Sequence, residues 1–229
     1  MKINVSTKDI LWTNLSVVVI LLVANVLVFF LERYGNNDAF GQFRMIFDFD
    51  TEENVPTIYS TMALLLISII LSRIASMNRQ SKLPYFPWLG LSIVFLFLAF
   101  DEFFQIHEAF INPVQSTLGV SGFRFYMWVI PYGIGLALLC ILYLRFLYGL
   151  PSKTSFLFIV SGAIYVSGAI GFELISGRYV DLNGRDGAVF FVVNTILETL
   201  EMFGLALFTY ALIGYIINQV SGLEVQIEQ

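Results

Sequence analysis

The stretch ILWTNLSVVVILLVANVLVFFL, from Ile10 to Leu31, decides the fold class of this chain. It contains no charged residue, and an apolar run of about 20 residues is long enough to cross the hydrocarbon core of a bilayer as one helix. It is longer than the apolar part of a secretory signal, and no small-residue cleavage site follows it. We therefore expect it to remain as the first transmembrane helix.

Five further apolar runs follow the first one. The chain is 58% hydrophobic and only 13% charged, with a mean hydropathy of +0.80, which is far from the composition of a soluble domain. The sequence predicts an all-α, polytopic membrane helix bundle that forms a single integral membrane domain over residues 1–229. The expected spans are about 10–31, 55–75, 88–108, 125–148, 155–176 and 188–217.

Lysine and arginine residues predict the orientation of the bundle. Cytoplasmic loops of membrane proteins carry an excess of these residues, so we expect both termini in the cytoplasm and the protein in the inner (plasma) membrane. The end with both termini holds Lys2, Lys8, Arg73, Arg79, Lys82, Arg145 and Lys153. The opposite end holds Arg33, Arg44, Arg124, Arg178 and Arg185.

Charge and cysteine content exclude several function classes. The net charge of −5 argues against nucleic acid as a partner, because nucleic acid requires a basic face. The single cysteine, Cys140, excludes an internal disulfide framework and a cysteine-based zinc site. The expected partner is the lipid bilayer. Gly162, Gly168 and Gly171 would also allow close helix packing, within the chain, with another membrane protein or with a second copy.

The stretch FLAFDEFFQIHEAF, from Phe97 to Phe110, carries acidic residues in the third span. A charged side chain at mid-bilayer costs at least about 2.5 kcal/mol, so such residues usually face the bundle interior or a wet cavity. In the expected topology, acidic residues of the third, fifth and sixth spans converge in the outer half. The predicted pocket residues are Asp101, Glu102, Gln105, His107, Glu108, Glu173, Asn194, Glu198 and Glu201.

Helical spacing divides these residues between faces. Asp101, Gln105 and Glu108 stand at i, i+4 and i+7, on one face of a continuous helix, and Asn194, Glu198 and Glu201 repeat that spacing. Glu102 and His107 would point away from the Asp101 face. Whether His107, the only histidine in the chain, joins the same pocket stays open.

Crowded carboxylates cannot all be ionised without a nearby cation, so either protons or a metal ion should neutralise them. Asp101, Glu108, Glu198 and Glu201 are the candidate metal ligands. This oxygen-rich set suits Ca²⁺, Mg²⁺ or Mn²⁺ better than Zn²⁺. Alternatively, the acids only hydrogen-bond within the bundle and hold it together.

The stretch FDFDTEENVPT, from Phe47 to Thr57, suggests a second cation site in an outer loop. Asp48, Asp50 and Glu52 alternate as at the start of an EF-hand loop, but Glu53 and Tyr59 stand where that loop needs Gly and Glu. A turn that caps the second span is the competing interpretation. Just before it, Phe40, Phe43 and Phe47 predict a short helix in the outer interface.

Three blocks, FDFDTEENVPTIYS, FDEFFQIHE and LETLEMFG, resemble a group of bacterial multi-pass inner-membrane proteins of unassigned function. The resemblance implies no activity. It implies that recurring motifs contain Asp101, Glu102, His107, Glu108, Glu198 and Glu201.

We also compared the chain with membrane hydrolases related to alkaline ceramidase, which use Ser, Asp and several His around zinc. Ser60 and Asp101 match two of these residue types. The second and third histidines are missing from this chain, so a zinc triad is not present.

Three functions remain open at this stage. The first is cation binding linked to transport or proton movement, and it ranks slightly above the others. The second is a metal-dependent, membrane-embedded enzyme acting on a lipid or lipid-linked substrate, and the third is an accessory or sensor subunit with a structural polar core. Below Glu201 the polar groups are few, chiefly Ser68, Ser72, Ser161 and Tyr165, so a complete path across the membrane is not evident.

Overall fold

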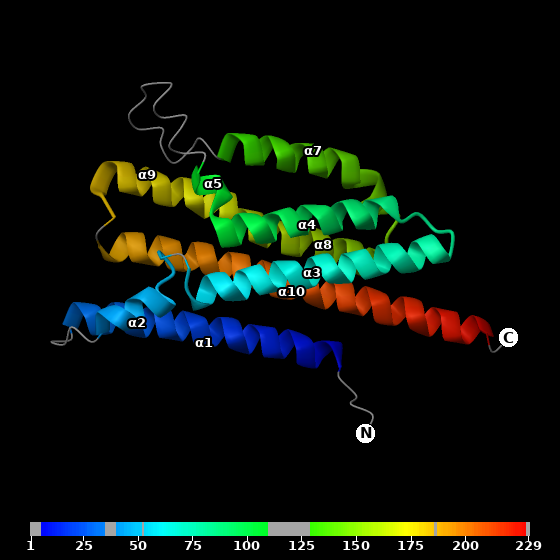
Figure 1. Ribbon diagram of the computed structural model, residues 1–229, viewed down its shortest axis with the longest axis horizontal. Coiled ribbons are helices and arrows are strands. Elements are labelled where there is room, and N and C mark those ends of the chain that lie inside the picture. Colours follow the sequence, from blue (N-terminus) through cyan, green and yellow to red (C-terminus); the bar gives the residue numbers. More distant parts are fainter. Residues whose placement is uncertain (1–5, 35–39, 52, 110–128, 186, 228–229) are drawn as a thin grey trace.

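A computed structural model describes residues 6–34, 40–51, 53–109, 129–185 and 187–227 of the chain (Figure 1). The regular structure in these ranges is helical, and six helical segments among them are long and apolar enough to cross a membrane. The prediction of an all-α polytopic bundle is therefore confirmed. The elements are α1 (Thr7–Tyr34), α2 (Phe40–Phe47), α3 (Val55–Gln80), α4 (Phe86–Phe104), α5 (Ile106–Ala109), α7 (Val129–Tyr148), α8 (Ser152–Val166), the π-helix η1 (Ser167–Phe172), α9 (Glu173–Asn183) and α10 (Ala188–Ile227).

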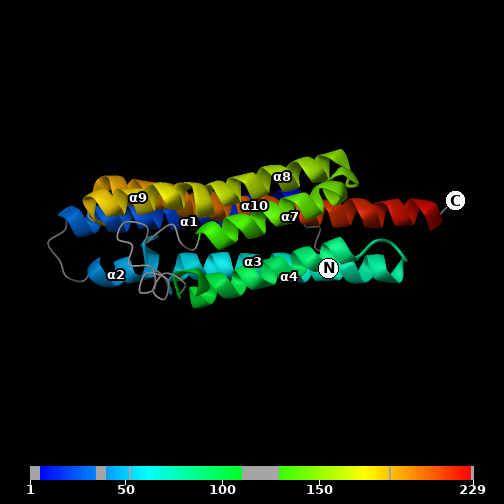
Figure 2. The ribbon, with the colours of Figure 1, turned by 90° about the horizontal axis from the view of Figure 1, so that it is seen from above.

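Helix α10 is the centre of the bundle and packs against α1, α3, α8, η1 and α9. Helices α3 and α4 form an antiparallel pair on one side, while α8 and α9 cover the other side (Figure 2). Helices α1 and α10 run in opposite directions, so both termini lie toward the same end of the bundle (Figure 1). An even number of spans that run in alternating directions places both ends of the chain on the same side, as seen here.

The start of α3 shows why the chain turns there. The side chain of Asn54 accepts a hydrogen bond from the backbone N–H of Thr57 at 3.0 Å, and Pro56 lies in the first turn. Both are favoured at helix starts, because the side chain satisfies a free N–H and proline lacks one. The cap prediction for this turn is confirmed.

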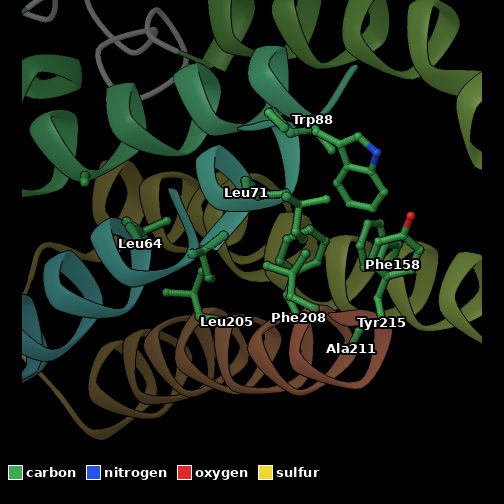
Figure 3. Close-up of a cluster of buried hydrophobic side chains, with 14 residues drawn as sticks. Leu64, Leu71, Trp88, Phe158, Leu205, Phe208, Ala211 and Tyr215 are labelled. Carbon is green, nitrogen blue, oxygen red and sulfur yellow. The ribbon is translucent and has the colours of Figure 1, made fainter. Parts of the chain in front are cut away.

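The larger packed core joins α3, α4, α8 and α10 in the half of the bundle toward the termini, and Figure 3 shows its buried side chains. Trp88, only 2% exposed, lies against Tyr215 with ring centroids 4.7 Å apart. Ser68 and Ser92 tie α3 to α4, because each hydroxyl donates to the carbonyl of the other residue, at 2.8 and 2.9 Å. These serines therefore satisfy each other's backbone and do not extend a polar path.

Helix α7 lies apart from the rest, and none of its residues is buried. Near its ends, two tyrosines hold it to α4. The hydroxyl of Tyr132 donates to Asp101 Oδ1 at 2.7 Å, and that of Tyr143 donates to the carbonyl of Pro87 at 2.9 Å. The second bond depends on Gly90, where any side chain would collide with the Tyr143 hydroxyl.

Candidate functional site

A cavity of about 850 Å³ lies between α4, α7, α10 and the segment from α8 to α9. It occupies the half of the bundle away from the termini. Leu205 and Phe208 belong both to the packed core and to the cavity lining, so the core closes the cavity toward the termini. Most of the lining is apolar, and most of its acidic groups come from α4, α9 and α10.

The structure places most of the sequence-predicted pocket residues on this one cavity. They come from two separate parts of the sequence, α4 with α5 and α9 with α10. The lining residues among them are Asp101, Glu102, His107, Glu173, Asn194, Glu198 and Glu201. Of the other two, Gln105 does not line the cavity, and the Glu108 side chain lies outside the described part of the chain.

The phenol of Tyr165 marks where the carboxylates converge. It lies within electrostatic range of four of them, Glu201, Glu102, Asp101 and Glu198. In the described ranges, however, no three His, Cys, Asp or Glu side chains are grouped so that they could hold a metal ion. Asp101, Glu198 and Glu201 therefore share a cavity without forming a three-ligand set.

The third span was predicted to run as one helix to residue 108. In the structure it is broken before that residue. Helix α4 ends at Phe104, and Gln105 adopts the left-handed conformation with φ of +53°. This conformation is uncommon for residues other than glycine and breaks the helical register. The predicted single face of Asp101, Gln105 and Glu108 is therefore wrong.

The break at Gln105 folds His107 back onto Asp101. The backbone N–H of His107 donates to Asp101 Oδ1 at 2.8 Å, and its ring Nδ1 lies 3.3 Å from Asp101 Oδ2. Continuous helical spacing had placed His107 on another face, so that expectation is also wrong. Asp101, only 7% exposed, thus joins His107 of α5 to Tyr132 of α7.

Two glycines bring the segment from α8 to η1 close to α10. A Cβ at Gly168 would lie 2.6 Å from the carbonyl oxygen of Leu197, and one at Gly204 would lie 2.8 Å from the backbone nitrogen of Tyr165. These contacts place Tyr165 and Glu201 beside each other. At Gly162 and Gly171 an added Cβ meets nothing within 4 Å, so of the three predicted packing glycines only Gly168 makes such a contact.

The acidic residues of the outer loop do not form the predicted EF-hand-like arrangement, and their side chains bind other partners. Asp48 Oδ2 accepts from Arg44 at 2.7 Å, and Asp48 Oδ1 accepts from the backbone of Asp50 at 3.0 Å. Asp50 instead lines the cavity, where Asn194 donates to its Oδ1 at 2.7 Å. Glu52 lies outside the described residues.

Burial raises the pKa of Asp50 to about 6, and the nearby negative charge of Asp48 adds to this, against the opposing effects of Arg185, Arg44 and the Asn194 hydrogen bond. Asp50 and Arg185 also line a second cavity of about 260 Å³ between α1, α2 and α10. Asp50 therefore lies at the boundary between the two cavities, with a pKa at which a carboxyl exchanges protons near neutral pH.

Asp50 should make the protein less stable as the pH rises from about 4 to about 6. In that window the unfolded chain has lost this proton and the folded chain still holds it, so folding is favoured below the window. The full difference would be about 3 kcal/mol, and partial exposure reduces the expected effect to about 1–2 kcal/mol. Thermal unfolding in detergent from pH 4 to pH 7 should show this slope in the wild type and lose it in Asp50→Asn. Equal slopes would contradict the assignment.

Sequence reasoning missed several polar cavity residues, among them Tyr132, Arg185 and Ser176, and it placed Asp50 at another site. Tyr132 lies in an apolar span, where nothing in the local pattern distinguishes it from an interfacial tyrosine. Arg185 lies in a turn-like stretch that carries no spacing signal. Asp50 was assigned to the outer loop, because its partner Asn194 is 144 residues away in the chain.

These features define a polytopic α-helical membrane protein with a large, partly acidic cavity between its spans. The chain belongs to the family described as Domain of unknown function (DUF8692), whose model matches residues 15–214. That range reaches into all six of the membrane-spanning segments described above. No curated protein and no solved structure matches the chain.

Proposed function

We propose that this protein binds a cation on the acidic wall of the cavity and exchanges it for protons, as part of cation transport. One observation carries the proposal: acidic residues of separate helices line a single cavity within the membrane-spanning bundle. Within the described residues, the acidic side chains of this lining are Asp50, Asp101, Glu102, Glu173, Glu198 and Glu201. The basic or titratable nitrogen side chains are Arg185 and His107.

This excess of acids creates competition between protons and cations. Like charges held close together in a medium of low dielectric constant disfavour ionisation, so some carboxyls keep a proton until a cation replaces it. Intramembrane acids that face a cavity are typical of ion and proton pathways. The Asp101–His107 pair and Asp50 are the groups best suited to take up and release the protons.

The closed floor of the cavity fits one state of an alternating-access cycle. Toward the termini, Leu205 and Phe208 block the cavity, and Ser161 uses its hydroxyl to bond the carbonyl of Leu157 at 2.7 Å. Alternating access requires a site near mid-membrane that is open to one side at a time. In a second state, the cavity would be open at the end toward the termini and closed at the opposite end.

The proposal is tested by cation-driven proton movement in proteoliposomes. Vesicles with a luminal pH dye receive Na⁺, K⁺, Ca²⁺, Mg²⁺, Mn²⁺ or a hydrophobic organic cation in turn. At least one cation should change the luminal pH faster than in protein-free vesicles. If every cation behaves as in protein-free vesicles, the transport proposal is wrong.

A second function is favoured by the contact between Asp101 and His107. A carboxylate that orients a histidine through Nδ1 is a common acid–base arrangement, and the adjoining apolar cavity would admit a lipid tail. The candidate is a membrane-embedded hydrolase that uses this pair for acid–base catalysis. Incubation with bacterial lipid extract and Mg²⁺ or Mn²⁺ should then release a product with the wild type and not with His107→Ala; unchanged lipids would exclude it.

The sidedness of the cavity is a separate prediction. Because lysine and arginine are more frequent at the end with the termini, we expect α2 to lie outside the cell. In a Cys140→Ser background, Met45→Cys, at an exposed position of α2, should react with a membrane-impermeant maleimide in intact cells. Leu83→Cys, at the opposite end, should react only after lysis, and the reverse pattern would place the cavity on the cytoplasmic side.

A further inference from the structure

The cavity is too large and too apolar for a bare metal ion. Its volume of about 850 Å³ falls in the range of small-molecule sites, roughly 300–1,000 Å³. Metal ions are held by several oxygen ligands at about 2.0–2.6 Å, and the part of the chain that the structure describes contains no such group. The ligand should therefore have a body larger than a metal ion.

The two walls of the cavity differ in chemistry. Helix α7 contributes mainly apolar groups, including Leu136, Leu139 and Leu142, while α4 and α10 carry most of the carboxylates. Phe95 and Phe208, whose rings stack at 4.9 Å, also line the cavity. A ligand with a positive charge on an apolar body would pair with the carboxylates and pack against the apolar groups.

Helix α7 lines the cavity and has no buried residue among those described. Its outer residues Ile134 and Ile141 are 58% and 66% exposed. The hydrogen bonds of Tyr132 and Tyr143 hold α7 to α4 near the two ends of the helix. An apolar ligand that concentrates in the bilayer would approach the cavity beside this helix.

We infer that the cavity binds a hydrophobic organic cation. The charge lies against Asp101, Glu198 and Glu201, and the apolar body lies against α7. This inference rests on the proposed function and narrows its cation to the organic class. Inorganic cations and neutral lipid tails are the alternatives that the experiment separates.

The probe is tetraphenylphosphonium, compared with tetraphenylborate, which has the same shape and the opposite charge. Wild-type protein in nanodiscs of neutral lipid is titrated by equilibrium dialysis, with protein-free nanodiscs as the blank. Tetraphenylphosphonium should bind saturably, more tightly at pH 8 than at pH 5, because protons compete for the carboxylates. Tetraphenylborate should not bind above the blank. Glu198→Gln should weaken tetraphenylphosphonium binding at least about tenfold.

Two glycines of α7 provide a matched pair that tests the location. An added Cβ meets nothing within 4 Å at either Gly133 or Gly135, but only Gly135 lines the cavity. Gly135→Phe should therefore fill the cavity and weaken binding at least about tenfold, while Gly133→Phe should bind as the wild type does. Gly162→Phe fills the cavity from α8 and serves if Gly135→Phe does not fold.

The possible outcomes distinguish failure of the organic-cation inference from failure of the proposed cation–proton exchange. Equal binding of both probes, or binding unchanged by Glu198→Gln and Gly135→Phe, overturns the organic-cation inference and leaves an unselective apolar cavity. Proton-linked movement of an inorganic cation without tetraphenylphosphonium binding overturns this inference and supports the proposed function. Failure of every cation in both assays overturns both.

Discussion

Glu198→Gln and Asp101→Asn are each expected to reduce proton-linked cation movement by about 100-fold or more while the protein stays folded. Each substitution removes one ionisable group in the region of low dielectric constant, where a lost charge contact costs about 2–5 kcal/mol. At Asp101, asparagine keeps an oxygen that accepts from Tyr132, so the contact between α4 and α7 is preserved. Proteoliposome flux at saturating cation measures the effect.

The matched control is Asp181→Asn. Asp181 lies on α9, is exposed and does not line the cavity, so it should transport as the wild type does. Size-exclusion profiles and helical circular dichroism should be the same for all three variants. If Glu198→Gln and Asp101→Asn unfold in detergent, and transport normally when refolded into lipid, the acids are structural and the proposed exchange fails.

Gly204→Ala is expected to destabilise the bundle by about 1–3 kcal/mol, the usual cost of overpacking, although alanine is the better helix former. The new Cβ would lie 2.8 Å from the backbone nitrogen of Tyr165 and 3.0 Å from the carbonyl oxygen of Ser161. Neither contact can be relieved by turning a flexible side chain, so α8 and α10 must separate. Thermal unfolding in a fixed detergent measures the loss, and Gly204→Leu should prevent folding.

Gly214 on the same helix is the control, because an added Cβ there meets nothing within 4 Å. Gly214→Ala should be neutral or stabilising by up to about 1 kcal/mol, the helix-propensity gain over glycine. Because the contact at Gly204 also positions Tyr165 near the carboxylates, Gly204→Ala should weaken cation binding. Equal stability of the two alanine variants would contradict the close packing described here.

The spans and the convergence of acids follow from simple rules. The length of the apolar runs predicts the six helices. Because neighbouring spans run in opposite directions, the acidic residues of α4, α9 and α10 lie in the same half of the membrane. Asp101, Glu173 and Glu198 could therefore be placed together from the sequence. The depth of each residue along its span was sufficient for this placement, because it depends on span length and direction and not on helical faces.

Periodicity failed where the backbone leaves the helix. No glycine or proline next to Gln105 indicates a left-handed residue at this position. The contact between His107 and Asp101 could therefore not be predicted from helical spacing. The π-helix η1 is likewise invisible to a 3.6-residue pattern, although single π-turns often occur at functional sites. The turn of Asp50 toward Asn194 depends on packing between elements at opposite ends of the chain.

The most direct test of proton–cation exchange is proton release on cation binding. Purified protein in weakly buffered detergent solution receives chlorides of Na⁺, Ca²⁺, Mg²⁺, Mn²⁺ and tetraphenylphosphonium in turn, while a pH electrode records the solution. We predict a stoichiometric release of protons with at least one cation, and none with the Asp101→Asn, Glu198→Gln double variant. No release with any cation, or the same release from the double variant, would contradict the central claim.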